Sequence, residues 1–434
     1  MNTDNKPYAA RRAALLERIG DGIAIIPTAP EHVRNRDTQY PFRYDSYFWH
    51  LTGFPEPEAV LVLIGGKSPR SVLFCREKNE EREIWDGFRN GPTAARDAFG
   101  FDETFPFNAF EEQLPDLLAN RDTLWYALGQ STAWDEKITT ALNAVRAQVR
   151  AGKNAPSTLR DIREPLDRMR LIKDAHELAM MRQAAAISSA GHLRAMRHCR
   201  PGIMEYELEA ELAHEYRRRG AAGHSFAPIV AGGANGCILH YVENDKRLAD
   251  GTLVLVDSGC EFNGYAGDIT RTYPVGGKFS AAQRDVYEIV LAAQAAAITT
   301  VAPGAPFIAY HEAALKVLVQ GMVDLGLLSG TVDGLIESEA YKPFYMHRTG
   351  HWLGLDVHDA GDYKRGDDWI KLEAGMTLTV EPGLYIRPLD GVPPHLQHIG
   401  IRIEDDILVT DKGCEVYTTT PKTIAGIEEA MRRA

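Results

Sequence analysis

Five side chains in the second half of the chain have the types and spacing of a site for divalent metal ions. Four are carboxylates and one is an imidazole, namely Asp257, Asp268, His351, Glu381 and Glu404. A ligand set rich in carboxylate oxygens suits Mn²⁺, Co²⁺ or Zn²⁺, and carboxylates can bridge two ions and offset their charge. Two ions that share a site can hold and deprotonate one water molecule, which is the central requirement of a hydrolase.

Apolar runs surround the carboxylates. Asp257 ends the run TLVLVD, Glu381 follows TLTV, and Glu404 follows GIRI. A buried carboxylate without a partner is costly, so a chain rarely places one at such a position without a role for it. One acid of this kind would be interpreted as an exposed strand end, whereas four together favour a metal site.

The two aspartates flank a glycine-rich segment that has the signature of a β-hairpin. Two short apolar runs are separated by Asn263 and Gly264, which favour a tight turn. Asp257 would leave the first strand and Asp268 would lie on the second, so that both could reach one ion. The alternative is an ordinary hairpin with a surface acid on each arm.

Three of the fourteen histidines, His347, His351 and His358, lie within one glycine-containing stretch, HRTGHWLGLDVHD. A single histidine is more often a structural hydrogen bonder than a catalyst. An imidazole that titrates near neutral pH can also donate to a developing oxyanion or carry protons. The clustering favours a role in a site.

The motifs DSG, GDITRTY, HWLGLDVHD, VEPGLYI and GIRIEDD resemble those of the dinuclear metallopeptidase family that includes methionine aminopeptidase, prolidase and aminopeptidase P. The similarity covers about residues 174–420 and is greatest to the bacterial aminopeptidase P (Xaa-Pro aminopeptidase) branch. The segment DTQYPFRYDSYFWHLTGFPEPEAVLVL is similar to the N-terminal domain of aminopeptidase P and prolidase, which methionine aminopeptidases lack.

The resemblance implies a role for each ligand. Asp257 would chelate one metal ion, and Asp268 and Glu404 would bridge both. His351 and Glu381 would complete the coordination of the other ion. Glu381 would also lie near the bridging hydroxide as a candidate proton acceptor. The resemblance thus implies two divalent ions, and we expect Mn²⁺.

Further site residues also come from the resemblance. His240, His347 and His358 match three active-site histidines that are not ligands, and Arg402 matches an arginine that braces the acidic cluster. We expect His358 to donate to the scissile carbonyl and His240 to carry a proton near the substrate amine.

Two residues of the N-terminal half match the family less closely. Trp85 resembles a tryptophan that reaches an active site from the N-terminal domain, although a tryptophan in this context is also typical of a packing residue. Arg150 corresponds to an arginine near the substrate.

The expected activity is that of an aminopeptidase that removes the N-terminal residue when proline follows, by attack of a metal-bridging hydroxide on the carbonyl before proline. The nearest alternative is a prolidase, which splits Xaa-Pro dipeptides with the same ligands. A scaffold or binding protein of the same fold and a metal-free, creatinase-like hydrolase are disfavoured by the intact ligand set. Substrates would be small peptides, and we expect a homo-oligomer, either a dimer or a tetramer.

The composition agrees with a globular enzyme. The net charge of −12 argues against nucleic acid as a ligand. The five cysteines are scattered without a CxxC pair, which predicts a reducing cytoplasm. No apolar run approaches the length of a membrane span, and the start MNTDNKPYAARR lacks the apolar segment of a signal peptide.

The predicted architecture is α/β (α+β) with two domains, residues 1–172 and 173–434. The first is mixed α/β, and its predicted strands are 22–27, 46–54, 59–66, 70–76 and 124–128. The second has two similar halves, in which helices 175–198 and 205–219, and then 281–300 and 309–327, precede strands. These halves are expected to pack their strands into one curved sheet, the pseudo-symmetric pita-bread fold of the family, with the metals in its cradle.

Overall fold

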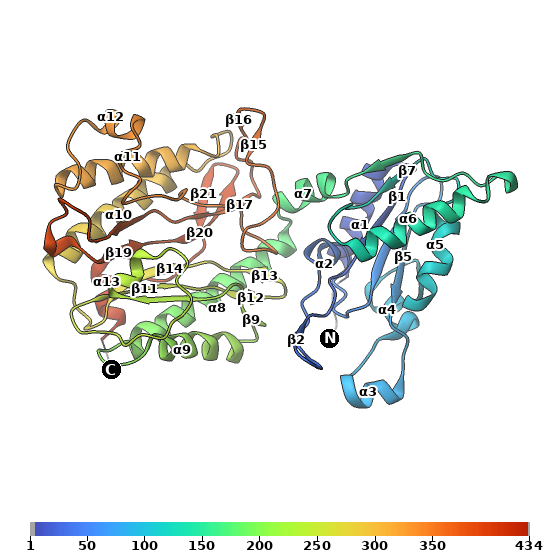
Figure 1. The fold of residues 1–434 in the computed structure, drawn as a ribbon, viewed down its shortest axis with the longest axis horizontal. Helices are drawn as coiled ribbons and strands as arrows, with labels where there is room; N and C mark the ends of the chain where they lie inside the picture. Colours follow the sequence, from blue (N-terminus) through green and yellow to red (C-terminus); the bar gives the residue numbers. More distant parts are fainter. Residues whose placement is uncertain (1–4, 433–434) are drawn as a thin grey trace. The chain divides into compact units, whose positions relative to one another are not determined.

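The computed structural model describes residues 5–432, and the chain divides into two compact units. The first ends at Met169 and the second begins at Arg170, close to the predicted domain boundary at residue 172. Each unit has its own sheets and its own core (Figure 1).

The first unit is built on one six-stranded sheet with the strand order β6-β5-β4-β1-β7-β8. Strand β1 (Ile23–Pro27) pairs antiparallel with β4 (Val60–Ile64) and parallel with β7 (Thr123–Trp125). Alternate residues of β1 enter two cores, because successive strand side chains point to opposite faces. Helices therefore cover both faces of the sheet. The remaining elements are α1 (Lys6–Ile19), β2 (Val33–Asn35), β3 (Thr38–Gln39), β5 (Arg70–Cys75), α3 (Glu80–Asp86), α4 (Gly91–Phe99), β6 (Glu103–Pro106), η1 (Phe107–Ala109), α5 (Phe110–Leu118), α6 (Thr132–Arg146), η2 (Val149–Ala151), β8 (Thr158–Arg160) and α7 (Arg163–Leu171), which crosses the boundary.

The predicted strand over residues 46–54 is wrong, because this segment forms helix α2 (Ser46–Thr52). Its aromatic content favoured a strand, but its two ends specify a helix. The Asp45 side chain accepts hydrogen bonds from the first turn, and Gly53 ends the helix in the left-handed conformation.

The second unit contains two similar halves. In the first, α8 (Ala175–His198) and α9 (Glu205–Arg218) precede the sheet β10-β11-β14. In the second, α10 (Ala281–Thr300) and α11 (Ala309–Asp324) precede the sheets β17-β20-β21 and β18-β19. All four helices begin at the predicted residues. The strands of these sheets are β10 (Ile229–Gly232), β11 (Leu253–Asp257), β14 (Thr270–Pro274), β17 (Thr377–Val380), β18 (Gly383–Ile386), β19 (Ile399–Arg402), β20 (Asp405–Thr410) and β21 (Gly413–Val416). The other elements are β9 (Gly223–His224), η3 (Gly233–Cys237), β12 (Cys260–Phe262), β13 (Tyr265–Ala266), α12 (Val332–Glu337), β15 (Lys364–Arg365), β16 (Asp368–Trp369), η4 (Pro394–Leu396) and α13 (Ile424–Ala430).

Hydrogen bonds join the two halves where β14 meets β19. The Thr272 hydroxyl donates to the carbonyl oxygen of Arg402 at 3.1 Å, and the Glu404 amide donates to the carbonyl oxygen of Thr270 at 3.1 Å. The two halves thus share one continuous hydrophobic core.

The predicted hairpin forms, with one difference. Strand β11 pairs antiparallel with β14, and β12 and β13 meet at a turn in which Asn263 and Gly264 both have positive φ. Asp268 lies between β13 and β14 and not on a strand, so its predicted strand position is wrong. The ladder is interrupted at Gly259, where a Cβ atom would lie 1.6 Å from the carbonyl oxygen of Gly267.

Over residues 5–432, no helix combines the length and the hydrophobicity needed to cross a lipid bilayer. All five cysteines lie in this range, and four of them, Cys75, Cys237, Cys260 and Cys414, are free thiols. Cys260 is fully buried in the core of the second unit.

Candidate metal centre

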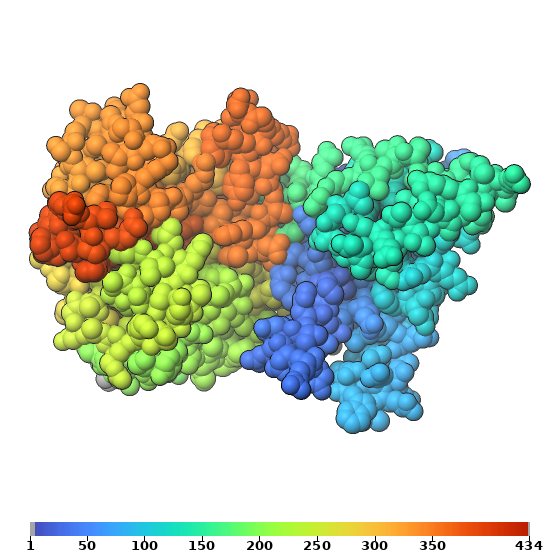
Figure 2. Space-filling view, viewed as in Figure 1, coloured from blue at the N-terminus to red at the C-terminus, as the bar shows by residue number. Residues whose placement is uncertain are grey.

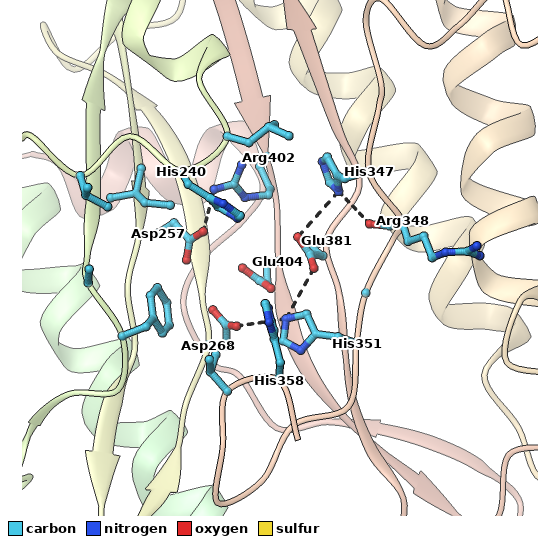
Figure 3. A pocket seen from close by; sticks show the side chains of 17 residues that line it. His240, Asp257, Asp268, His347, Arg348, His351, His358, Glu381, Arg402 and Glu404 are labelled. Atoms are coloured by element: carbon cyan, nitrogen blue, oxygen red, sulfur yellow. Dashed lines mark hydrogen bonds and ion pairs between the residues drawn. The ribbon is translucent and has the colours of Figure 1, made fainter. Parts of the chain in front are cut away.

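A cavity of about 500 Å³ in the second unit brings together all five predicted ligands, the three predicted histidines and Arg402 (Figure 3). Its wall contains residues of both halves. In Figure 2, the yellow-green surface of the first half meets the orange surface of the second half on the same unit. Apolar side chains that the sequence did not single out complete the wall, including Phe226, Leu239, Val242 and Val357.

The carboxylates converge because each follows or interrupts a strand of the central sheets. Asp257 is the last residue of β11, and Glu381 follows β17 directly. Glu404 lies between β19 and β20, and Asp268 lies between β13 and β14. Side chains at these strand ends leave the core and point into the cavity (Figure 3).

Short distances connect the predicted ligands. Asp268, His351 and Glu404 each offer a ligand atom, and these three atoms lie within 4.8 Å of one another. His351 Nε2 is 3.4 Å from Asp268 Oδ2 and 3.7 Å from Glu381 Oε1. The Oδ1 atom of Asp257 is buried and finds no hydrogen-bond donor among the described residues.

The electrostatics of the cluster call for a cation. Burial, reinforced by the neighbouring carboxylates, raises the pKa of Asp268 and of Glu404 well above the ordinary carboxyl value. Burial also raises the pKa of Glu381. A bound cation would offset the mutual repulsion of these charges and keep the acids ionised at neutral pH.

The orientation of His351 agrees with a ligand role. Its Nδ1 lies 2.9 Å from the carbonyl oxygen of Trp352, which can only accept, so this nitrogen carries the proton. The other ring nitrogen, Nε2, faces the oxygens of Asp268 and Glu381. A metal ion would fit between such a nitrogen and these oxygens, and a backbone partner on the other nitrogen is typical of ligating histidines.

His347 lies beside the carboxylates and has a defined tautomer. Its Nδ1 donates to the carbonyl oxygen of Arg348 at 2.7 Å, and its Nε2 lies 2.7 Å from the Tyr385 hydroxyl. Burial, together with the nearby Arg402 charge, lowers the pKa of His347 to about 3. The ring is thus neutral at physiological pH, and Nε2 accepts from Tyr385. The sequence assigned no role to Tyr385.

Arg402 braces the acidic cluster through three hydrogen bonds. Its Nη2 donates to Asp257 Oδ2 at 2.6 Å, its Nη1 to the Tyr385 hydroxyl at 3.0 Å and its Nε to the Thr270 hydroxyl at 3.1 Å. The Thr270 hydroxyl in turn donates to Glu404 Oε2 at 2.6 Å. One guanidinium therefore orients carboxylates from both halves.

His358 and His240 are exposed to the cavity, unlike the ligands. The rings of His358 and His351 meet edge to face, with centroids 4.3 Å apart. Burial lowers the pKa of His358, and the neighbouring imidazoles of His351 and His240 add to the effect. A neutral His358 can donate one hydrogen bond into the cavity.

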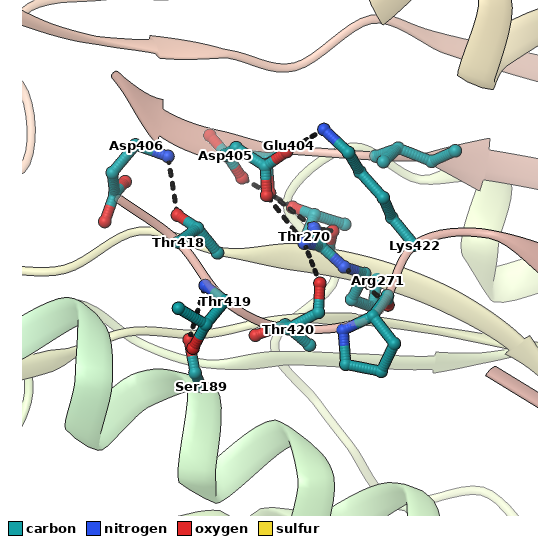
Figure 4. A network of polar contacts seen from close by, with 12 residues as sticks. Ser189, Thr270, Arg271, Glu404, Asp405, Asp406, Thr418, Thr419, Thr420 and Lys422 are labelled. Carbon is teal, nitrogen blue, oxygen red and sulfur yellow. Dashed lines mark hydrogen bonds and ion pairs between the residues drawn. The ribbon is translucent and has the colours of Figure 1, made fainter. Parts of the chain in front are cut away.

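A second network of polar contacts, centred on Arg271, holds the backbone of Glu404 (Figure 4). Arg271, which is fully buried, donates to the carbonyl oxygens of Glu404 at 2.6 Å and Thr270 at 2.9 Å, and to the Asp405 carboxylate at 2.6 Å. Lys422 donates to the other oxygen of Asp405 at 2.5 Å. No local sequence pattern pointed to Arg271, because its partners are distant in the chain.

The two residues predicted in the N-terminal half lie in the first unit. The Trp85 side chain on α3 is 82% exposed, so it does not pack into the core of this unit. Arg150 lies in η2 and is also exposed. Their predicted contribution to an active site stays a prediction.

The sequence pattern of metallopeptidase family M24 matches residues 179–411, more than half of the chain and all five predicted ligands. The chain belongs to this family. The pattern of the aminopeptidase P N-terminal domain matches residues 8–125, so this M24 enzyme carries that domain in its first unit. The resemblance found in the motifs is thereby confirmed.

Named relatives of this M24 protein align over nearly its whole length. The Xaa-Pro aminopeptidase of Escherichia coli (strain K12) is 46% identical over 433 residues, which cover 98% of each chain. Xaa-Pro aminopeptidase 3 of Homo sapiens is 33% identical, with 98% of this chain and 86% of that one covered.

Solved structures of aminopeptidases are also similar to this chain over nearly its whole length. The aminopeptidase PepP of Pseudomonas aeruginosa has a TM-score of 0.97 at 49% identity, covering 99% of this chain and 98% of that one. Aminopeptidase P from E. coli with the inhibitor Pro-Leu has a TM-score of 0.96 at 45% identity and covers 99% of both chains.

Proposed function

We propose that this M24 family member is a metal-dependent aminopeptidase that releases the N-terminal residue from peptides with proline in second position. The observation that carries the proposal is the convergence of the five predicted metal ligands in one cavity of about 500 Å³, which has room for a short peptide. The full-length similarity to Xaa-Pro aminopeptidases supports the choice of substrate.

The residues of the cavity fit a pair of divalent ions. The ions would be held by Asp257, Asp268, His351, Glu381 and Glu404, and the oxygen-rich set favours Mn²⁺. When bound, such ions supply Lewis acidity and lower the pKa of a coordinated water molecule. Two observations support this assignment: Oδ1 of Asp257 is buried without a hydrogen-bond donor among the described residues, and Nε2 of His351 faces the carboxylates.

The chain itself provides proton transfer and orientation. Glu381 would accept the proton of the attacking water, since its carboxylate lies among the ligands. His358 would donate a hydrogen bond to the carbonyl oxygen before proline as negative charge develops there. His240, on the wall of the same cavity, would carry a proton near the substrate amine, and Arg402 would hold Asp257 in place.

Replacing His358 with alanine should lower kcat by roughly 10²–10³-fold, which is typical for the loss of one oxyanion donor. Metal content should stay at the wild-type level, because His358 would not be a ligand. Steady-state kinetics and elemental analysis of the purified variant measure both quantities. His395→Ala, at an exposed histidine outside the cavity, is the matched control. A variant that loses metal would make His358 a ligand or a ligand support.

Substrate length decides between an aminopeptidase and a prolidase. An aminopeptidase leaves room beyond proline, so Xaa-Pro-Xaa and longer peptides should be cleaved at least as efficiently as an Xaa-Pro dipeptide. A prolidase needs a cation for the proline carboxylate and a wall that stops longer chains. The measurement is kcat/KM for a series of peptides of rising length.

Replacing proline with alanine in the same peptides serves as the internal control. A pocket shaped for the pyrrolidine ring should gain less from a small, flexible side chain, so kcat/KM should fall sharply. Strong preference for the dipeptide, without cleavage of longer chains, would move the assignment to prolidase.

We also propose a cytoplasmic enzyme that forms a homo-oligomer, either a dimer or a tetramer. The scattered cysteines, of which Cys75, Cys237, Cys260 and Cys414 are free thiols, support a reducing compartment. Helix α3 supports self-association, since it has no buried residue and carries Ile84 and Trp85, which are 81% and 82% exposed. Sedimentation analysis measures the state directly.

A further inference from the structure

Asp359, the residue that follows His358, is a buried carboxylate held by two cations. Its side chain is 1% exposed. Arg170 Nη2 donates to Oδ1 at 2.5 Å, and Lys173 Nζ donates to Oδ2 at 2.9 Å. Burial disfavours the charged carboxylate, but Lys173 and Arg170 outweigh it and lower the pKa of Asp359 to about 2. The group is therefore an ionised anchor at every physiological pH.

The loop that contains His358 makes several hydrogen bonds to Asp359 and Arg170. The Asp359 carboxylate accepts from the backbone amide of Asp356 at 3.3 Å, and Arg170 also donates to the Asp356 carboxylate at 2.6 Å. The Asp359 amide donates to the carbonyl oxygen of Trp352 at 3.0 Å. A Cβ atom at position 354 would lie 2.2 Å from Asp359 Oδ2, so only Gly354 permits this approach.

Both cations lie at or beside helix ends. Arg170 lies in the last turn of α7, and Lys173 precedes Asp174, which caps α8 through a complete capping box. The Lys173 amide also donates to the carbonyl oxygen of Gly375 at 2.9 Å. The anchor is thus held by residues at the end of α7 and directly before the cap of α8.

His358 and Asp359 differ completely in exposure, although they are adjacent. The His358 ring faces the cavity, whereas the Asp359 carboxylate is enclosed in protein. The backbone between them must therefore hold a defined conformation for the ring to point at the substrate. A misplacement of about 1 Å in such a group can lower a rate about 100-fold.

We propose that Asp359, fixed by Arg170 and Lys173, is a positioning residue that sets the orientation of His358 for the reaction. The proposal rests on the proposed function, in which His358 donates to the scissile carbonyl. A purely structural role predicts a different outcome: loss of stability without a specific effect on the step that His358 serves.

A double-mutant cycle between Asp359→Asn and His358→Ala distinguishes the two roles. Asp359→Asn alone should lower kcat about 10–100-fold, with metal content unchanged and KM little affected. In the His358→Ala background the same change should lower kcat by less than about threefold, because the group it positions is absent. Effects that multiply would overturn the proposal. If His358→Ala alone leaves kcat unchanged, the assigned role of His358 fails instead, and the positioning role fails with it.

Two further variants keep the test decisive. Arg170→Lys preserves the buried charge but replaces the guanidinium that reaches both Asp356 and Asp359, so it should lower kcat in wild type and not in His358→Ala. If Asp359→Asn does not fold, Arg170→Lys takes its place in the double-mutant cycle. The matched control is Glu428→Gln, because Glu428 accepts from Lys278 and Arg284, both at 2.6 Å, outside the cavity. Its kcat should equal that of wild type, and an equal loss in this control would also overturn the proposal.

Discussion

Removing divalent ions with EDTA should abolish peptide hydrolysis, and adding Mn²⁺ should restore it. The cavity offers no other activated nucleophile among its described lining residues, and its acidic side chains can hold the ions that activate water. Initial rates, measured together with metal content by elemental analysis, give the result. EDTA that has been saturated with Mn²⁺ beforehand is the control for effects of the chelator itself.

Metal removal should also change stability in a pH-dependent way. In the metal-free fold, burial and neighbouring charges raise the pKa of Asp268 and Glu404. The folded chain then binds these protons more readily than the unfolded chain, whose carboxyl pKa is about 4. The free energy of unfolding of the metal-free protein therefore falls as the pH rises from this value through the folded-state pKa values.

Bound ions cancel this penalty, so Mn²⁺ should raise the melting temperature at pH 7 and have less effect at acidic pH, where protons compete with the metal. Thermal unfolding of metal-free and reloaded protein across this range gives the comparison. Full activity after verified removal of all metal would refute the assignment of the site.

Local sequence patterns predicted those site residues whose position depends only on the segment that contains them. Asp257, Glu381 and Glu404 each end an apolar run, and the structure places all three in one cavity. Helices α8 to α11 of the second unit were also predictable from local sequence, in which capping residues mark helix starts. Ser280, for example, caps α10 through a complete capping box.

The parts that the sequence did not predict depend on contacts between distant residues. Arg170 and Asp359 are 189 positions apart, and Arg271 and Glu404 are 133 positions apart. No pattern within either segment specifies such a pair. Tyr385 likewise lies in an ordinary apolar strand, and its hydroxyl acquires a role only because His347 and Arg402 meet there.

The error over residues 46–54 has a local cause. Side-chain type favoured a strand, but Asp45 and Gly53 outside the aromatic core of the segment determine the helix. Capping residues thus outweighed intrinsic strand propensity, which depends strongly on context.

Replacing Glu404 with alanine should abolish turnover and leave the fold largely intact. Glu404 would bridge both ions, so its loss removes a ligand from each and lowers metal affinity. The fold should tolerate the change, because the backbone of Glu404 keeps its bonds to Arg271 and Thr270. In the metal-free state the variant should be at least as stable as wild type at pH 7, since a buried, repelled charge has been removed.

Two variants make the Glu404 result specific. Glu404→Gln keeps the shape of the side chain and removes its charge, so a comparable loss of activity would assign the effect to the charge and not to a cavity. Glu31→Ala, at an exposed acid of the first unit, should retain wild-type activity. Titration of each metal-free protein with Mn²⁺, followed by calorimetry, separates loss of binding from loss of chemistry. If Glu404→Ala turns over substrate at the wild-type rate, or binds two ions with wild-type affinity, Glu404 does not bridge the metals, and the site must be rebuilt around Asp268 and Glu381.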